Sequence, residues 1–493
     1  MQCCDPEQAT TFGGMDWVRQ RFERIAGAEN FDHYVLGGLR PVLLGEEFKG
    51  GRYTIVNKLG YGGDSTVWLA KDDFSGAGDD HVAFKIYRAD HSLSTDWVSD
   101  ISGARTYHES MELLRQASGA NKQYVLLPHS DFVWPGCPNG LRVDLGDGIH
   151  HVQVYPVAGP SIADRTNVAK DNHLGITQAK RAIRQIVLGL QFMHSHGIGH
   201  GDLHSSNILE QAHETDLPFL TELFRTVAQT RNPKSLEGQP PGTRYWGGWC
   251  GEAGVPAYAV LAMTPLLLDK LPTCRSVAIA DMGAMFKSPA QDKPGKRKCK
   301  VTNCAPERLM GLEYGLPSDI WSLGCLIFEI LFGRELFSLM VQTPDTCVLV
   351  EITKRLGWPP NSLHQSWKQA QSSDSLGTPS GKRFFYDIRE TIETMRNGDA
   401  ALNVPERLED FSEEEISQLT DLLCSMVQYK PAARPTIAEV LDHPWTQSLR
   451  DCESPVMQSR EEESFDEDTS EDDEDTAMDD AMLNGCHTFP VYG

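Results

Sequence analysis

The sequence predicts an α+β protein in which a small, strand-rich part precedes a larger, mainly helical part. Short apolar and β-branched runs at residues 53–59, 66–70 and 81–87 are separated by Gly, Asp and Ser, as in antiparallel strands. After Gly159 the apolar residues recur at helical spacing instead. Ligands often bind between two such parts, so we expect the functional site at their boundary.

The remaining elements follow in chain order. A helix is expected near residues 107–117, and two more strands at 125–127 and 151–157. Residues 177–194 carry one apolar stripe, whereas 318–332 are apolar nearly all round, which indicates a helix buried on every side. Two late helices begin at the capping boxes Ser412-x-x-Glu415 and Thr436-x-x-Glu439.

Composition divides the chain further. Residues 1–51 form an N-terminal extension, 52–158 an N-lobe and 159–450 a C-lobe, which a segment rich in Pro, Gly and Trp interrupts at about 211–275. Residues 451–493 form a tail in which 461–480 hold 13 acidic residues and no basic residue. Such a segment is too polar to fold on itself, so we expect an acidic, disordered tail.

The net charge of −24 argues against nucleic acid as a direct ligand and suits a basic partner. The 12 cysteines lack metal-type spacing, so we expect free thiols in a reducing compartment. The N-terminus has no signal-peptide core, and the longest apolar run, 258–268, is too short to span a bilayer. We expect a soluble monomer in the cytoplasm, the nucleus or both, without membrane contact.

Two motifs in the N-lobe suggest phosphate binding. Residues 59–67 read LGYGGDSTV between two predicted strands, and glycines there let a backbone turn approach phosphates closely. Lys85 ends the apolar run VAFK, where burial of its ammonium requires a partner such as a phosphate or a carboxylate. Taken alone, the first motif is more often an ordinary glycine-rich hairpin, and an edge lysine facing solvent explains the second motif equally well.

The decisive segment is HGDLHSSNIL at residues 200–209. The carboxylate of Asp202 is suited to accept a proton from a hydroxyl, and Asn207 five residues later can turn back to bind a metal. Further motifs follow in order at residues 279–283 (IADMG), 304–307 (CAPE), 318–324 (SDIWSLG) and 430–435 (KPAARP). Seven elements in this order resemble a eukaryotic protein kinase over about residues 52–450, with Arg434 where the family pairs an arginine with Glu307.

The resemblance narrows to the SR-protein kinases, above all to their divergent fungal members. It rests on YVLGGLRPVLLG at 34–45, STVWLAKD at 65–72, LGWPP at 356–360 and the long insert. It implies a bilobal protein-kinase fold and a serine/threonine protein kinase. Its cofactors would be ATP and Mg²⁺, and its partners basic, arginine/serine-rich protein substrates.

The resemblance also implies a role for each site residue. Asp202 would be the catalytic base, Asn207 and Asp281 would hold Mg²⁺, and Lys85 would hold the α- and β-phosphates. The remaining nucleotide-binding residues would be Leu59, Gly60, Gly62, Ser65, Val67, Ala83, Pro156, Ala158 and Leu209, with Glu109 as the helix partner of Lys85.

Four positions depart from the family pattern. Gly201 replaces the arginine that grips an activation-loop phosphate, which predicts activity without such a phosphate. His204 replaces a lysine and Lys300 a threonine. Either the ammonium of Lys300 reaches toward Asp202 in place of the missing cation, or Lys300 ends the basic run 296–300 in solvent or in a nuclear-targeting patch. The alignment puts Ser110 at the helix-glutamate position, with Glu109 one residue away and Glu112 as a poorer candidate.

These departures leave two non-catalytic interpretations open. One is a pseudokinase scaffold that binds ATP or basic partner proteins without efficient catalysis. The other is an acidic module that sequesters arginine-rich proteins. Because Asp202, Asn207 and Asp281 are all present, the sequence favours an active kinase.

Overall fold

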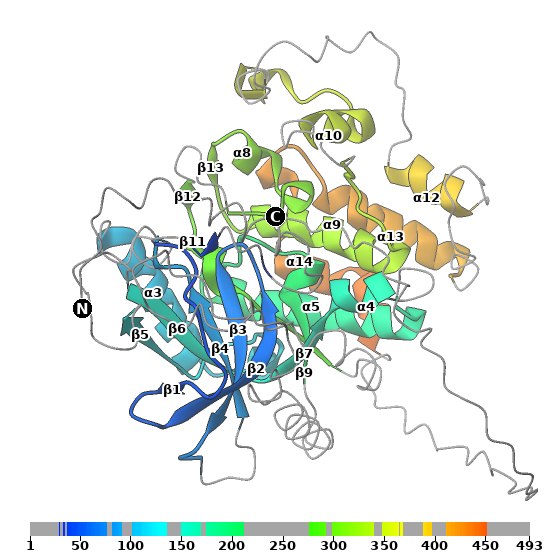
Figure 1. Ribbon diagram of the computed structural model, residues 1–493. Helices are drawn as coiled ribbons and strands as arrows, with labels where there is room; N and C mark the ends of the chain where they lie inside the picture. The colour runs from blue at the N-terminus through cyan, green and yellow to red at the C-terminus, as the bar shows by residue number, and fades with distance from the viewer. Residues whose placement is uncertain are drawn as a thin grey trace, which may run out of the picture.

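The computed structural model describes Glu29 and residues 33–34, 37–75, 81–90, 101–135, 149–168, 174–211, 276–291, 298–339, 348–363, 365–367, 388–396 and 411–450. Most of the predicted insert and the whole acidic tail lie outside the described residues, as do residues 1–28 of the extension. Within this part of the chain the predicted α+β fold with two lobes is confirmed, a sheet on one side and helices on the other (Figure 1).

The N-lobe is built on a six-stranded antiparallel sheet in the order β1-β2-β3-β4-β6-β5. Its strands are β1 (Glu47–Phe48), β2 (Tyr53–Tyr61), β3 (Ser65–Asp72), β4 (His81–Tyr87), β5 (Ser130–Pro135) and β6 (Ile149–Pro156). The prediction of a strand at 125–127 is wrong. Leu126 donates its N–H to the carbonyl of Ile279 at 2.8 Å, which ties this stretch to the C-lobe, and the strand begins only at Ser130.

One face of the sheet is covered by residues that precede Arg52. Phe48 packs edge-on against Phe84 of β4 at 5.5 Å between ring centroids, and Trp134 lies 4.7 Å from Phe48. The Arg40 guanidinium closes this cluster over the ring of Phe48. Side chains alternate along a strand, so Lys85, next to Phe84, projects from the opposite face toward the C-lobe.

A buried ion pair fixes the start of the described chain to the sheet. The Lys58 ammonium lies 2.6 and 2.7 Å from the two carboxylate oxygens of Glu29, and both side chains are buried. The same ammonium lies over the Trp68 ring. Burial lowers the pKa of Lys58, although Glu29 opposes that effect. Lys58 is next to the glycine-rich turn, so this pair holds the strand from which the turn begins.

Replacing Glu29 with Ala is expected to destabilise the protein by about 3–5 kcal/mol, because an unpaired buried ammonium remains. Chemical denaturation would measure the loss. Asp73→Ala breaks the exposed Lys71–Asp73 pair and serves as the control that should leave stability unchanged. Equal stability of the two variants would contradict the role assigned to Glu29.

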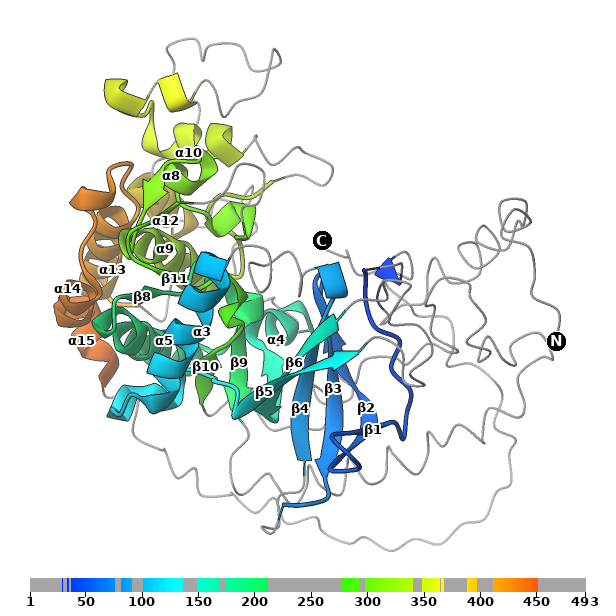
Figure 2. The same cartoon turned by 90° about the vertical axis from the view of Figure 1, so that its left-hand side faces the viewer.

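Helices dominate the C-lobe (Figure 2). Helix α3 (Ile101–Gln116) lies beside the sheet, and the other α-helices are α4 (Ile162–Val168), α5 (Ile176–Ser195), α8 (Pro306–Leu309), α9 (Pro317–Phe332), α10 (Val348–Leu356), α12 (Ile388–Arg396), α13 (Glu413–Met426), α14 (Ile437–Asp442) and α15 (Pro444–Ser448). Nearly every residue of α9 is buried, as its apolar circumference predicts. Both capping boxes are confirmed at the starts of α13 and α14.

Short strands and 3₁₀ turns lie between the longer elements of the chain. The strands are β7 (Ala158–Ser161), β8 (Ile198–Gly199), β9 (Ile208–Gln211), β10 (Val277–Ile279), β11 (Phe286–Lys287), β12 (Ala290–Gln291) and β13 (Glu313–Tyr314). The turns are η3 (Ala120–Tyr124), η5 (Ser205–Asn207), η7 (Met282–Ala284), η8 (Val301–Asn303), η10 (Asn361–Leu363) and η13 (Pro431–Ala433). Pairing of β9 with β10 brings Asn207 and Asp281, which are far apart in the sequence, to the same end of one ribbon.

Candidate active site

A buried carboxylate of α9 holds the loop that carries Asp202. The carboxylate of Asp319 accepts the backbone N–H groups of His200 at 2.7 Å and Gly201 at 2.9 Å. It also accepts a hydrogen bond from His194 of α5 at 3.0 Å. Burial would raise the pKa of Asp319, but the His194 ring and these donors lower it overall. Asp319 therefore stays ionised and holds the backbone of the loop that carries Asp202.

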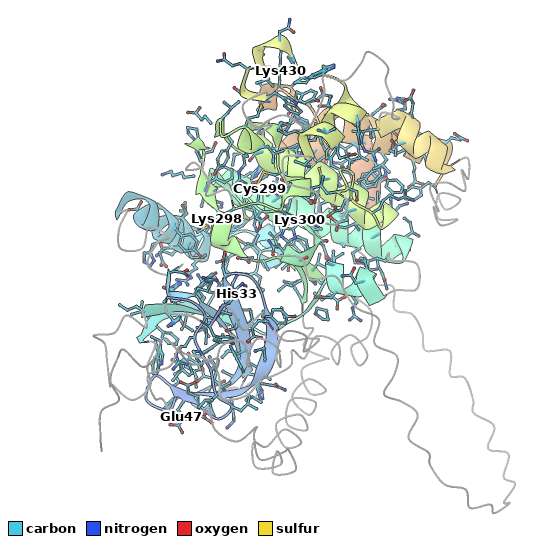
Figure 3. All side chains as sticks on the ribbon, turned by 45° about the horizontal axis from the view of Figure 1, so that its top comes forward. His33, Glu47, Lys298, Cys299, Lys300 and Lys430 are labelled. Carbon is cyan, nitrogen blue, oxygen red and sulfur yellow. A yellow bond between two sulfur atoms is a disulfide. The ribbon has the colours of Figure 1, made fainter. Side chains whose placement is uncertain are left out.

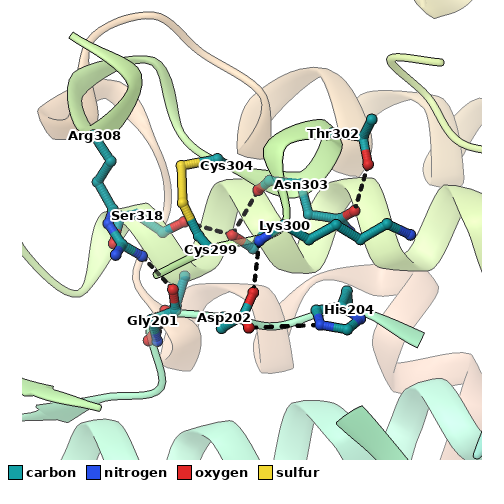
Figure 4. The surroundings of a disulfide bond; sticks show 12 residues. Gly201, Asp202, His204, Cys299, Lys300, Thr302, Asn303, Cys304, Arg308 and Ser318 are labelled. Atoms are coloured by element: carbon teal, nitrogen blue, oxygen red, sulfur yellow. Dashed lines mark hydrogen bonds and ion pairs between the residues drawn. A yellow bond between two sulfur atoms is a disulfide. The ribbon is translucent and has the colours of Figure 1, made fainter. Parts of the chain in front are cut away.

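Asp202 directly follows Gly201 in this loop, and Figure 4 shows it beside His204 and Lys300. Its Oδ1 accepts the backbone N–H of Lys300 at 2.7 Å, and its carbonyl accepts the Asn207 amide at 2.9 Å. The His204 ring lies 3.6 Å from Oδ2. Burial would raise the pKa of Asp202, but His204 and the Lys300 N–H lower it below the ordinary value. An ionised carboxylate held in this way can accept a proton from a hydroxyl.

Lys85 and Asp281 form an ion pair between the lobes, with 2.7 Å between Nζ and Oδ1. Asp281 adopts a left-handed backbone conformation, with φ of 60°, and its Oδ1 accepts the N–H of Gly283. Burial would raise the pKa of Asp281, but the Lys85 ammonium lowers it to about 2. Burial acts to lower the pKa of Lys85, and Asp281 raises it above the ordinary value. Both groups are therefore charged at neutral pH.

The predicted nucleotide-binding residues meet across neighbouring strands. The strand register sets Gly60 opposite Val67, Val67 opposite Lys85, and Val82 opposite Pro156. On the C-lobe side, Leu209 of β9 pairs with Ser161 of β7, three residues after Ala158. Ala83 and Ser65 are buried, Gly62 is exposed in the turn, and the others are partly exposed: Leu59, Gly60, Val67, Lys85, Pro156, Ala158 and Leu209. Most of these residues therefore keep some surface that solvent can reach.

The donor set near Asp281 fits a hard divalent cation. Asp281 supplies a carboxylate and Asn207 an amide oxygen, and the Asn207 NH₂ group already donates to Asp202. The part of the chain that the structure describes contains no group of three or more His, Cys, Asp or Glu that would hold a metal alone. Asn207 and Asp281 could hold Mg²⁺, which commonly takes one or two protein ligands together with phosphate oxygens.

Glu109 is not the partner of Lys85. Its side chain is exposed, and the ion pair of Lys85 is made with Asp281. The two residues that follow Glu109 in α3, Ser110 and Met111, are buried instead. Because one residue along a helix turns the side chain by about 100°, α3 would have to rotate before Glu109 could face the sheet.

The expectation that the ammonium of Lys300 reaches toward Asp202 is also wrong. Its ammonium lies 2.8 Å from Glu335 and 3.9 Å from Glu329, and only the backbone N–H reaches Asp202. Figure 4 shows the side chain extending away from Asp202. Burial acts to lower the pKa of Lys300, but Glu329 and Glu335 raise it overall. The ammonium of Lys300 therefore does not pair with the Asp202 carboxylate, and the ring of His204 lies beside that carboxylate.

Gly201 leaves no room for the missing arginine. Its φ is +83°, and a Cβ there would overlap the carbonyl oxygen of Ala284. Arg308, which directly follows the A-P-E motif, donates instead to the Gly201 carbonyl and lies over the Tyr314 ring. The side chain of Arg308 thus supports the loop that contains Gly201 by binding the backbone carbonyl of that loop.

The predicted pair of Glu307 and Arg434 is confirmed. Two hydrogen bonds of 2.7 Å join the guanidinium to the carboxylate, and both side chains are buried. Arg434 also lies over the ring of Trp321 in α9. Met282, which follows Asp281, is fully buried in the C-lobe core. These contacts fix the segment after Asp281 and the A-P-E motif to the helical core.

The expectation that all cysteines are free is wrong for Cys299 and Cys304, which form a disulfide. The bond encloses Lys300 and η8, and Figure 3 shows Cys299 on the C-lobe, beside Lys298 and Lys300. Spacing alone gave no signal, because the turn of η8 brings the two sulfurs together. Among the described residues, Cys325 and Cys424 take no part in a disulfide.

Reduction of this disulfide is expected to lower stability by about 2 kcal/mol, the chain-entropy value for a six-residue loop. Thermal denaturation with and without a dithiol reductant would measure the loss. The Cys299→Ser/Cys304→Ser variant is the control, because its midpoint should match the reduced protein and ignore the reductant. A reductant-induced shift that persists in this variant would show that another part of the chain is responsible.

Within the described segments, no helix is long and apolar enough to cross a membrane.

Comparisons with known proteins agree with this geometry. A family model for the protein kinase domain matches residues 265–446. The serine/threonine-protein kinase SRPK of Physarum polycephalum is 25% identical over 433 residues, which cover 85% of this chain and 91% of that protein. Protein kinase dsk1 of Schizosaccharomyces pombe is 23% identical over 504 residues, 86% of each chain.

A third relative matches over a shorter stretch. Serine/threonine-protein kinase SKY1 of Saccharomyces cerevisiae is 32% identical over 213 residues, which cover 42% of this chain and 26% of that protein. The two-lobed fold, the kinase-domain match and these relatives show that the chain is a protein serine/threonine kinase, similar in sequence to the SR-protein kinases and divergent from them.

Proposed function

We propose that this kinase transfers the γ-phosphate of ATP to serine or threonine hydroxyls in arginine/serine-rich proteins. The observation that carries the proposal is the pair of charged groups at the lobe boundary. Lys85 is paired with Asp281 at 2.7 Å, and the ionised Asp202 is fixed by the Lys300 N–H and joined to Asn207.

Each residue has a defined task in this proposal. Asp202 orients the acceptor hydroxyl and takes its proton, while Lys85 binds the α- and β-phosphate oxygens. Asp281 and Asn207 hold Mg²⁺, which when bound neutralises phosphate charge. Gly60, Gly62 and Ser65 cover the phosphates, and a final set lines the adenine region: Leu59, Val67, Ala83, Pro156, Ala158 and Leu209. At Pro156 the carbonyl, and at Ala158 the N–H, would meet the base.

Charge supports the choice of substrate. A chain with a net charge of −24 attracts arginine-rich partners and repels nucleic acid. The relatives named above are kinases of protein substrates. We further propose that the kinase acts as a monomer in the cytoplasm or nucleus, with residues 52–158 and 159–450 as its lobes.

The test is transfer of labelled phosphate from ATP to an arginine–serine repeat peptide, with Asp202→Ala as the inactive control. A lysine–serine peptide and a glutamate–serine peptide of equal length test whether arginine itself is selected. Equal rates on all three peptides would refute the substrate class but not the activity. An absence of transfer, together with a thermal shift on Mg–ATP, would establish the pseudokinase alternative.

A further inference from the structure

The helix beside Lys85 presents a tyrosine where an acid was expected. Tyr107, Ser110, Met111 and Leu114 recur at i, i+3, i+4 and i+7 and form the inner face of α3. Ser110, Met111 and Leu114 are buried, Tyr107 is partly buried, and Glu109 is exposed. On this face Tyr107 is the residue whose polar group reaches the sheet near Lys85.

A glutamine connects this tyrosine to the strand of Lys85. Gln153 of β6 is directly opposite Lys85 of β4, so both side chains project from the same face of the sheet. The Gln153 NH₂ group donates to the Tyr107 hydroxyl at 3.0 Å. Its Oε1 accepts the hydroxyls of Tyr155 at 2.8 Å and Tyr87 at 2.9 Å.

The same tyrosines surround the Lys85 side chain. Tyr87 and Tyr155 are each two residues beyond Lys85 and Gln153, so they share that face of the sheet. The Lys85 ammonium lies 5.0 Å from the centroid of the Tyr87 ring. Burial raises the pKa of Tyr107 to about 12, although the Gln153 hydrogen bond opposes the rise, so its hydroxyl stays neutral. A neutral network therefore joins α3, β4 and β6 around the ammonium.

We propose that Tyr107, acting through Gln153, is the positioning residue that couples α3 to Lys85 in place of a helix carboxylate. The proposal rests on the kinase activity, in which Lys85 binds phosphate oxygens. A helix carboxylate would hold the ammonium by charge. Here hydrogen bonds hold the tyrosines around the ammonium in place. The charge of Lys85 therefore remains available to Asp281 and to phosphates.

The test compares steady-state kinetics of single and double variants. Tyr107→Phe removes one hydroxyl and is expected to raise KM for ATP roughly three- to ten-fold, the effect of one lost neutral hydrogen bond. KM for the peptide should not change. A purely structural defect would lower the fraction of active enzyme, and with it the apparent kcat, while KM for ATP stayed constant. Glu112→Gln, on the outer side of α3, is the matched control and should behave as wild type.

Two further variants decide between the candidates on α3. In a Gln153→Leu background, Tyr107→Phe should have no additional effect on KM for ATP, because its partner is already gone. Additive effects of the two substitutions would overturn the proposal. So would a rise in KM for ATP in Glu109→Gln that exceeds the rise in Tyr107→Phe.

An inactive wild-type chain would refute the proposed function separately. The network is then judged by a double-mutant cycle of Tyr107→Phe and Gln153→Leu in thermal denaturation, which needs no activity. Non-additive midpoints would support the coupling of α3 to the sheet, and additive midpoints would overturn it.

Discussion

Asp281→Asn is expected to lower kcat by at least about a hundred-fold, the loss typical of removing one group that stabilises charge in a transition state. The substitution keeps the shape of the side chain and an oxygen that can accept the Gly283 N–H. It removes the charge that binds Mg²⁺ and pairs with Lys85 at 2.7 Å. Phosphate transfer to an arginine–serine peptide would measure the loss, and an unchanged rate would refute the site assignment.

The same variant should lose some stability, because the Lys85 ammonium remains without its partner. Adding Lys85→Met removes that unpaired charge, so the double variant should recover stability but not activity. Circular dichroism of Asp281→Asn alone gives its folded fraction, and this separates a catalytic defect from unfolding. If the activity of Asp281→Asn per folded molecule equals that of the wild type, the loss is one of stability and the site assignment fails.

The sign of the pH dependence follows from the pKa of Asp281. Folding lowers that pKa from 3.8 to about 2, so the folded state binds this proton more weakly than the unfolded chain does. The pair with Lys85 therefore contributes its full stability above about pH 4. That contribution is lost as the pH falls toward 2, and Asp281→Asn should remove this part of the acid dependence of unfolding.

The positions of residues that lie in short sequence motifs could be predicted from the sequence. Asp202 and Asn207 are five residues apart, and the turn η5 lets the Asn207 amide donate to the Asp202 carbonyl, so their spacing determines their geometry. Glu307 and Arg434 are far apart in sequence, but each lies in a distinctive local motif. The fold class was predictable for a similar reason, because the apolar period changes once, after Gly159.

The other contacts of the site depend on how helices are rotated and how side chains turn, which the spacing of residues in the sequence does not show. The partner of Lys85 depends on how α3 is turned, and a slip of one residue changes the face by about 100°. The backbone N–H of Lys300 contacts Asp202, but its ammonium turns to Glu335 because two carboxylates of the α9 region attract it. The pairing of Cys299 with Cys304 likewise depends on the turn of η8 between them.

Gly201→Arg restores the arginine of the related kinases, yet it is expected to abolish activity. At φ of +83° any side chain is strained by about 1–3 kcal/mol. A Cβ would also overlap the Ala284 carbonyl and lie 3.3 Å from the Phe286 ring. To relieve the overlap the loop must move, which breaks the hydrogen bonds of Gly201 with Asp319 and Arg308. Asp202, the proposed catalytic base, is the next residue and would move with the loop.

Gly197 offers a matched control for the backbone strain. Its φ is +71°, but a Cβ there would meet no atom within 4 Å. Gly197→Ala should therefore show the cost of the conformation alone, whereas Gly201→Ala should add the overlap and lose activity. Circular dichroism and phosphate transfer would be measured on both. Equal behaviour of the two alanine variants would show that the contact with Ala284 is unimportant.

The same geometry predicts how the enzyme responds to phosphatase. With no side chain at position 201, the loop offers no guanidinium there to a phosphate on the segment that follows Asp281, and Arg308 is already engaged by the Gly201 carbonyl. Treatment of the purified kinase with a broad phosphatase should therefore leave its activity unchanged. The contrary result would be loss of most activity on treatment, regained on incubation with ATP. It would mean that other cations bind an activating phosphate, so that the enzyme depends on phosphorylation despite Gly201.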